Sequence, residues 1–210
     1  MILQPPNHNI LIESQIFPPI QTIAYCIKTN NILFEASENY QKRSFRNRYQ
    51  IGSHQGILEL TIPLSKGKND HQAITEVKIS YDSDWPNIHW KAIQSSYGKS
   101  AYFIYYKDLI ADVLFSNSNY LFEINLLSWK LIQGILQQDW NIQFTEQYSS
   151  QVTDDILDLR SKINLKNIRT LEIPEYYQVF SGTTGFIPQL SILDLIFHFG
   201  PEAYLYLRAM

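Results

Sequence analysis

The chain has 210 residues, of which 45% are hydrophobic and 18% are charged, and its formal net charge is -3 at pH 7. A chain of this length and composition can bury a true hydrophobic core, which excludes an intrinsically disordered protein. The slightly acidic balance excludes a basic domain that binds nucleic acid through a broad positive surface, so any anion site must be local.

Cys26 is the one cysteine of the chain and cannot form an intramolecular disulfide. Its apolar neighbours favour a packing role. The first nine residues contain no Lys or Arg, unlike a secretory signal, and no run of about 18 uncharged apolar residues predicts a membrane span. We therefore expect a cytoplasmic protein.

The N-terminal part predicts a βαβ unit. Residues 11–14 favour a strand, after which Pro18 and Pro19 suit the first turn of a helix over residues 20–28. A second strand is expected over residues 32–36. The two strands of such a unit lie parallel and are joined by a right-handed crossover.

The next segment predicts antiparallel pairing. Residues 48–51 and 57–64 flank a five-residue loop with two glycines, and apolar and polar residues alternate along the second of these runs. Residues 74–80 alternate in the same way. The sequence therefore predicts an α/β fold with a mixed β-sheet that starts from the βαβ unit.

Helices are expected to flank this sheet. Further strands are predicted at residues 142–146 and 176–180. Nothing marks a domain boundary, so we expect a single domain over residues 1–210, in which the poorly patterned residues 149–170 form a mobile loop or lid. The predicted helices span residues 84–97, 108–115, 120–138, 190–199 and 201–207.

Residues 39–48 contain the highest density of potential ligand-binding side chains, including four of the seventeen Lys and Arg residues. Arg side chains bind phosphate or carboxylate oxygens through paired hydrogen bonds, and Lys adds a point charge. The segment follows the end of a predicted parallel strand, where open α/β sheets usually bind ligands. We therefore expect a small anionic metabolite here. The candidate ligand-binding residues are Asn39, Tyr40, Lys42, Arg43, Arg46, Asn47 and Arg48, with Gln15 at the end of the first strand.

The same cluster of cations also fits two alternative roles. A charged edge strand commonly prevents pairing between sheets, which would make the cations structural. Cations beside the aromatic rings of Tyr40 and Phe45 are also compatible with RNA binding. The acidic net charge and the lack of an aromatic RNA-binding strand argue against a nucleic-acid ligand.

His89 is the candidate catalytic residue for proton transfer. It continues a row of helical neighbours with Trp85, Ile93 and Tyr97, each four residues apart. An imidazole titrates near working pH and can act as an acid or a base. A core histidine with satisfied hydrogen bonds is the alternative.

Asp194 interrupts the apolar run 190–199, where a buried carboxylate is costly unless it is paired. It is a candidate site residue that holds an arginine or orients His89. Ser191, three residues earlier, gives a helix-start pattern and favours a structural role instead.

Common cofactor and metal signatures are absent. The five histidines are spread singly, and the chain contains neither a glycine-rich phosphate-binding loop nor a nucleophile-elbow pattern. We therefore expect neither a metal nor a cofactor.

Several segments together resemble the WbqC-like family of bacterial proteins, which occurs among genes for O-antigen and other surface polysaccharides. The chain departs from the family pattern at Ile16, where Tyr is usual, and at Gln189, where Asn is expected. The segments that carry the resemblance are residues 12–20 (IESQIFPPI), residues 38–48 (ENYQKRSFRNR), the row Trp85, His89 and Tyr97, residues 185–188 (GFIP), residues 191–195 (SILDL) and residues 200–203 (GPEA).

The resemblance implies a transferase of surface-polysaccharide synthesis. Roles such as the addition of an aminoacyl or acyl group to an amino sugar have been suggested for this family. The leading hypothesis is a cytoplasmic transferase that acts on a small anionic substrate such as a nucleotide sugar. The alternative is a non-catalytic binding or scaffolding protein whose arginines pair with buried carboxylates such as Asp194 or Glu13, with RNA binding third.

Overall fold

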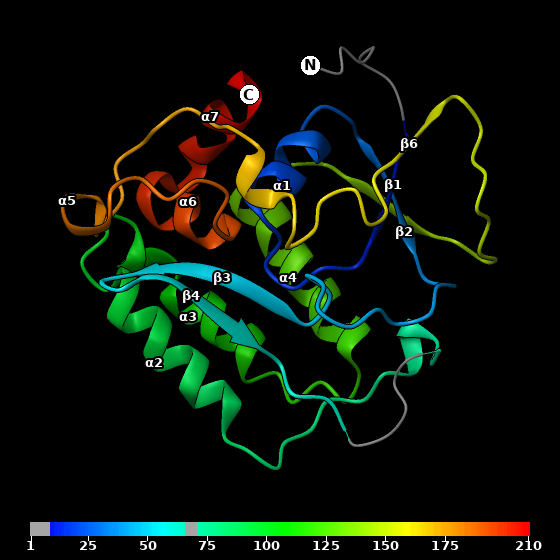
Figure 1. Ribbon diagram of the computed structural model, residues 1–210, viewed down its shortest axis with the longest axis horizontal. Helices are drawn as coiled ribbons and strands as arrows, with labels where there is room; N and C mark the ends of the chain where they lie inside the picture. The colour runs from blue at the N-terminus through cyan, green and yellow to red at the C-terminus, as the bar shows by residue number, and fades with distance from the viewer. Residues whose placement is uncertain (1–8, 66–70) are drawn as a thin grey trace.

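The computed structural model describes residues 9–65 and 71–210 and shows an α/β fold (Figure 1). A four-stranded parallel sheet has the spatial order β5-β2-β1-β6. The chain adds β2 and β5 on one side of β1 and then returns to place β6 on the other side. The four strands are β1 (Asn9–Glu13), β2 (Asn31–Glu35), β5 (Asn141–Phe144) and β6 (Ile156–Asp158).

The predicted βαβ unit is confirmed. The helix α1 (Ile20–Cys26) connects β1 to β2, which pair in parallel register with Ile10 opposite Ile32. Its first turn begins directly after Pro19, whose carbonyl accepts the amide of Thr22. Proline suits this place because the first amides of a helix have no intrahelical acceptor. The carboxyl ends of β1 and β2 therefore meet at one edge of the sheet.

The predicted hairpin is also present, as β3 (Arg48–Ser53) and β4 (Gly56–Thr61). The fold thus contains both predicted kinds of strand pairing, but they are divided between two sheets. β3 packs against α2 and α6 rather than beside a parallel strand. In Figure 1 the hairpin lies across the helical part of the molecule, away from β1 and β2.

Helices form most of the remaining structure. Ser191 caps the start of α6 through its Oγ, which accepts the Leu193 amide at 3.2 Å. None of the helices in the described part of the chain is both long and apolar enough to cross a bilayer. The helices are α2 (Trp85–Tyr97), α3 (Phe103–Leu114), α4 (Leu121–Ile135), α5 (Ser181–Thr184), α6 (Ile192–Phe199) and α7 (Ala203–Ala209), with 3-10 turns at Ile74–Glu76, Ile168–Thr170 and Gly200–Glu202.

Three sequence-based expectations differ from the structure. Residues 74–80 form a 3-10 turn and two isolated bridges rather than a strand, because Ile74 and Val77 are both buried three residues apart. Residues 176–180 are irregular, and α3 begins five residues before the predicted start at residue 108. Residues 149–170, the predicted mobile loop or lid, contain the short strand β6, which pairs with β1, and their mobility stays a prediction.

The buried side chains form one main hydrophobic core and a small second cluster. The main core surrounds residues such as Phe34 and Trp129, whose rings contact edge to face. Cys26 is fully buried within it, and burial raises the pKa of its thiol, in keeping with a packing role. The second cluster consists of Phe45, Ile163 and Ile168.

Candidate functional site

The carboxyl edge of the parallel sheet carries a group of acidic side chains. Glu13 ends β1 and Glu35 ends β2, and these two buried residues are direct neighbours in the sheet register. The guanidinium of Arg160 binds the Glu35 carboxylate at 2.7 Å and that of Asp158, at the end of β6, at 2.8 Å. Hydrogen bonds with Asp158 raise the pKa of Arg160, so this side chain stays charged.

Neutral groups satisfy the remaining oxygens of these carboxylates. Glu35 accepts the amide of Ser37 at 3.0 Å and the hydroxyl of Thr145 at 2.5 Å. Glu13 accepts the side-chain amide of Gln15 at 3.0 Å and the backbone amide of Ser161 at 2.9 Å. The acidic edge is therefore a connected network that ties β1, β2 and β6 together.

Glu38 and Arg46 form a second buried ion pair close to this edge. The Arg46 Nε donates to one carboxylate oxygen at 2.7 Å and an Nη to the other at 2.5 Å, in a bidentate arrangement. Arg46 is 1% exposed and Glu38 is 4% exposed. Burial raises the pKa of Glu38, and the negative charges of Glu13 and Glu35 raise it further, which together outweigh the opposing effect of Arg46.

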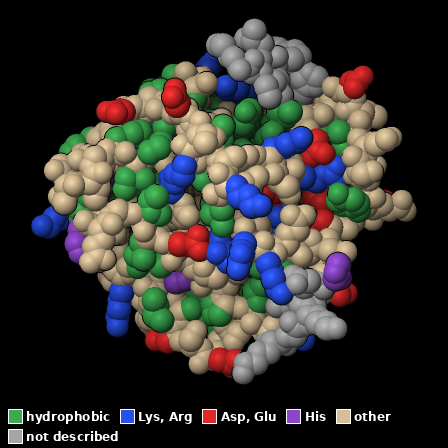
Figure 2. Space-filling view, in the orientation of Figure 1, with side chains coloured by type: hydrophobic (Ala, Val, Ile, Leu, Met, Phe, Trp, Pro, Cys, Tyr) green, Lys and Arg blue, Asp and Glu red, His purple; other side chains and the backbone are tan. Residues whose placement is uncertain are grey.

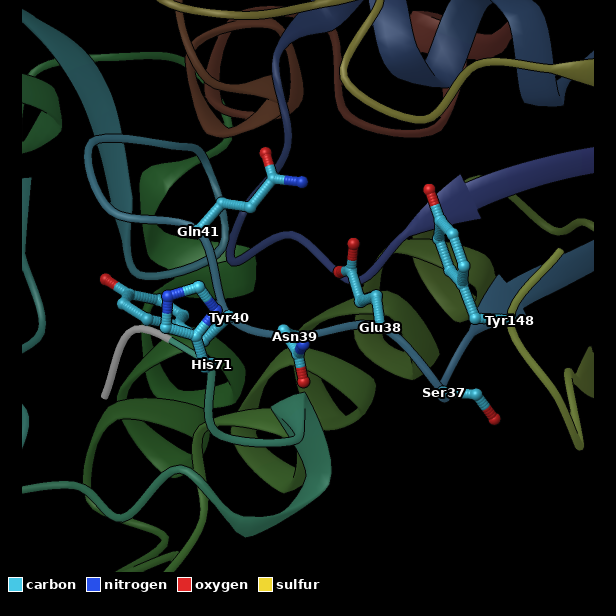
Figure 3. Close-up of a pocket in the computed structure, with 7 residues that line it drawn as sticks. All are labelled: Ser37, Glu38, Asn39, Tyr40, Gln41, His71 and Tyr148. Atoms are coloured by element: carbon cyan, nitrogen blue, oxygen red, sulfur yellow. The ribbon is translucent and has the colours of Figure 1, made fainter. Parts of the chain in front are cut away.

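A cavity of about 510 Å³ opens beside Glu38. Figure 3 shows Glu38, Gln41 and Tyr148 extending to one side of the chain, while Ser37 and Asn39 extend to the other. The residues that line it are Ser37, Glu38, Asn39, Tyr40, Gln41, His71 and Tyr148. Hydroxyl, amide and carboxylate groups beside an aromatic ring are suited to a hydroxylated ligand that also offers a flat apolar face.

Two of the predicted ligand-binding residues, Asn39 and Tyr40, line this cavity, and Arg43 and Lys42 are exposed in the turn that follows. Arg43 has a left-handed backbone conformation, with φ of 55°. Gln15 is buried and is bound by the Thr22 hydroxyl at 3.1 Å as well as by Glu13. The cavity therefore receives only part of the predicted set.

The other three predicted residues of this segment are held by the protein itself. Arg46 is bound to Glu38, and Arg48 pairs with Glu59 across the hairpin at 2.6 Å. The Asn47 side chain donates to the Ile62 carbonyl at 2.9 Å, while its buried Oδ1 has no hydrogen-bond partner among the described residues.

His89 lies in the core under the hairpin and does not line the cavity. Its Nδ1 is 3.1 Å from the Tyr49 hydroxyl, and its ring contacts that of Trp85 edge to face at 5.1 Å between centroids. Burial lowers the pKa of His89 to about 4. The imidazole is therefore neutral at pH 7.

Asp194 lies in the first turn of α6 and is 2% exposed. Its carboxylate accepts the Tyr176 hydroxyl at 2.6 Å and the Gln178 side-chain amide at 3.0 Å. Burial raises the pKa of Tyr176 far above its usual value, and the adjacent Asp194 charge adds to the effect. Asp194 thus fastens the irregular segment around residues 176–178 to α6, some distance along the chain from the cavity residues.

Several residues of the acidic edge and the cavity were not among the sequence-based candidates. A signal for Glu13 and Glu35 was present, because each is the second-to-last residue of a predicted strand of the βαβ unit. Tyr148 also follows the end of a predicted strand, residues 142–146, whereas Arg160 lies in the poorly patterned segment and carried no such signal. In the structure the Arg160 guanidinium lies 4.9 Å from the centre of the Tyr148 ring. Across residues 9–65 and 71–210, no three His, Cys, Asp or Glu side chains are grouped as a metal site would need.

Comparisons with known proteins assign the chain to a family. The model of the WbqC-like protein family matches residues 14–168 and 159–206. The uncharacterized protein Rv1507c of Mycobacterium tuberculosis is 26% identical over 196 residues, which cover 80% of this chain and 84% of that protein. No solved structure matches significantly. Because the family model extends over nearly the whole chain, this protein belongs to the WbqC-like protein family.

Proposed function

We propose that the protein binds a small anionic sugar derivative, such as a nucleotide sugar, in the cavity beside Glu38. The observation that carries this proposal is the position of the cavity, beyond the carboxyl ends of the parallel neighbours β2 and β5, where open α/β sheets bind their ligands. The Tyr148 ring stacks on a sugar face, and Gln41, on the same side of the chain as Tyr148 and Glu38, hydrogen-bonds to its hydroxyl groups.

The reaction proposed for this site is group transfer in bacterial surface-polysaccharide synthesis, such as O-antigen synthesis, carried out in the cytoplasm. The amine of an amino sugar attacks the carbonyl carbon of an acyl thioester, so that an N–C bond forms and the C–S bond breaks. Glu38 accepts the proton that the amine loses, and the departing thiolate takes up that proton. The raised pKa of Glu38 supports this role, because a carboxylate with a higher pKa is a stronger base.

This assignment replaces the roles expected for His89 and Arg46. His89 is buried away from the cavity, and Arg46 donates its charged hydrogen bonds to both carboxylate oxygens of Glu38. Arg46 instead holds the Glu38 carboxylate in place, which makes it a positioning residue in this proposal.

Binding of UDP-N-acetylglucosamine, measured by isothermal titration calorimetry, tests the first half of the proposal. Tyr148→Ala should weaken binding about twofold to twelvefold, because aromatic stacking contributes roughly 0.5–1.5 kcal/mol. Tyr105→Ala is the matched control, since Tyr105 is 70% exposed on α3 and does not line the cavity. Equal affinity of both variants and the wild type, or no binding at all, contradicts the proposal.

The second half is tested by transfer from acetyl-coenzyme A to UDP-glucosamine, followed by mass spectrometry. Glu38→Gln keeps one oxygen acceptor for Arg46 but removes the base, so the folded variant should bind the sugar nucleotide and lose at least 100-fold in rate. It should also lose stability, because the buried Arg46 no longer has a counter-charge. Circular dichroism verifies that this variant is folded.

A non-catalytic binding or scaffolding role is the second candidate. The ion pairs Arg46–Glu38 and Arg48–Glu59 favour it, because they show arginines of the family segment engaged within the protein. Sugar-nucleotide binding that depends on Tyr148, without transfer by the wild-type protein, would support this candidate over the transferase.

A further inference from the structure

Two short segments hold nearly half of the positive charge of the protein. Residues 41–48 and 160–169 contain eight of the seventeen Lys and Arg residues and no Asp or Glu. They are more than 110 residues apart in the chain. An acidic protein that concentrates its cations in this way has a local positive field, which attracts an anionic ligand.

The fold brings these two segments together. Phe45 of the first segment forms the small hydrophobic cluster with Ile163 and Ile168 of the second. The Ser161 hydroxyl donates to the side-chain oxygen of Gln41 at 3.2 Å. The turns that carry Lys42 and Lys162 therefore lie side by side on the surface.

The eight cations divide into two groups. The arginines of the first group are bound by other groups of the protein, because each donates to a carboxylate, a side-chain amide oxygen or a backbone carbonyl; they are Arg46, Arg48, Arg160 and Arg169. The other four are exposed and form what we call the cationic surface. It consists of Lys42, Arg43, Lys162 and Lys166.

Figure 2 shows Lys and Arg side chains gathered across the middle of the face that presents the hairpin and the sheet edge. The positive charges of Arg43, Lys162 and Lys166 create a local potential that attracts an anion. Arg43 also has a left-handed backbone conformation, which is strained for a residue with a Cβ. Strained conformations of this kind are often found at ligand-binding sites.

The cationic surface is continuous with the cavity. Gln41 lines the cavity and also accepts the Ser161 hydroxyl, so one side chain links the cavity to the turn that carries Lys162. Lys42 and Arg43 directly follow Gln41 in the chain. A ligand whose sugar lies in the cavity would therefore extend its charged part over these cations.

We propose that the cationic surface binds the diphosphate of a sugar diphosphate whose sugar occupies the cavity. This inference rests on the proposed function and adds Lys162 and Lys166, from the second segment, to the recognition of the ligand. Four cations match the two to three charges of a diphosphate diester or monoester. They are too few and too local for a polyanion such as RNA, which is bound along an extended basic surface.

The test compares two triple variants that change the net charge equally. Arg43→Gln, Lys162→Gln and Lys166→Gln together remove charge from the cationic surface. Lys91→Gln, Lys99→Gln and Lys130→Gln remove the same charge from exposed positions on or beside α2 and α4. Binding of inorganic pyrophosphate, UDP and UDP-N-acetylglucosamine is measured by isothermal titration calorimetry at low and physiological salt.

The first triple variant should bind pyrophosphate and UDP at least tenfold more weakly, whereas the second should lose less than twofold. Equal losses in both triple variants overturn the inference. So does binding of phosphatidylglycerol vesicles or of a single-stranded RNA, but not of pyrophosphate, by the wild-type protein.

The outcome separates this inference from the proposed function. If UDP-N-acetylglucosamine binding needs Tyr148 but is unchanged in the first triple variant, the sugar cavity stands and the cationic surface fails. If pyrophosphate binding needs the three cations while the sugar adds no affinity and Tyr148→Ala has no effect, the cationic surface stands and the proposed function fails.

Discussion

Arginines that are close neighbours in the sequence have different surroundings in the fold. Arg46 is buried in a bidentate pair with Glu38, Arg48 is partly exposed beside Glu59, and Arg43 faces solvent. A buried charge loses its hydration, so its partner becomes indispensable, whereas an exposed charge keeps water as an alternative partner. The same residue type therefore has a structural role at one position and is available to a ligand at another.

This difference predicts the stability of two variants. Arg46→Ala leaves Glu38 buried without its partner and should lower the free energy of unfolding by about 3–5 kcal/mol. Arg48→Ala breaks an exposed pair and should cost no more than about 1 kcal/mol. Urea denaturation measures both values, and similar losses for the two variants would contradict the burial argument.

His89 predicts a specific dependence of stability on pH. Its pKa of about 4 in the folded protein lies below its usual value near 6.5, so between these values the unfolded chain binds a proton that the folded protein does not. This residue should therefore cost about 3 kcal/mol of stability as the pH falls from 7 to 4.

The wild type and His89→Asn should differ in this pH range, with a shallower loss of stability in the variant. His54→Asn, at an exposed position in the hairpin turn, controls for the loss of one imidazole. Chemical denaturation at several pH values provides the measurement, and identical slopes for the wild type and His89→Asn would refute the assignment.

The sequence indicated which segment of the chain lies at the candidate site, but not which individual residues line the cavity. It placed Asn39 and Tyr40 at a strand end, where they line the cavity. It did not distinguish Arg46 from Arg43, because the partner Glu38 precedes both and only the fold decides which guanidinium reaches it. Tyr148 follows the predicted strand 142–146, but only the pairing of β5 with β2 brings it beside residues 37–41, and that pairing has no local signal.

Among the secondary-structure elements, helix ends were predicted reliably where a single residue acts within one turn of the helix. Pro19, Ser191 and Gly200 mark helix ends that the structure confirms, because each satisfies or removes a terminal backbone group. β6 was missed because it spans three residues, and only its pairing with β1 defines it. Short strands at a sheet edge have little periodicity of their own.

Two glycines in helical regions predict opposite effects of the same substitution. Gly200 has φ of 56°, and an added Cβ would lie 2.4 Å from the Tyr102 ring, so Gly200→Ala should destabilise by about 2–4 kcal/mol. Gly134 lies within α4 with open space around it, so Gly134→Ala should stabilise by about 0.5–1 kcal/mol. Denaturation midpoints measure both effects, and changes of the same sign would contradict the difference in backbone conformation and space.

The whole molecule combines one large core with the small cluster of Phe45, Ile163 and Ile168. The α/β class and the βαβ start followed from periodicity, but the separation into two sheets did not, since strand pairing between distant segments has no local signature. The expectation that residues 149–170 move as a lid stays a prediction, although residues 156–158 within it belong to the sheet.

Hydrogen exchange followed by mass spectrometry should reveal the two clusters as separate units. Amides of β1 and β2 should exchange only on global unfolding, whereas residues 161–171 should open at a lower free energy because few apolar contacts hold them. Phe45→Ala should accelerate exchange in residues 161–171 and leave the pattern of β1 unchanged. Phe115→Ala, on the exposed end of α3, is the control, and uniform exchange would contradict the division.

The late position of β6 has a consequence for synthesis on the ribosome. β1 emerges first, but its second neighbour in the sheet is translated more than 140 residues later. At typical elongation rates this delay is on the order of ten seconds. During that time the free side of β1 offers unpaired backbone groups to other nascent chains, and a chain that terminates before residue 156 keeps that side open permanently.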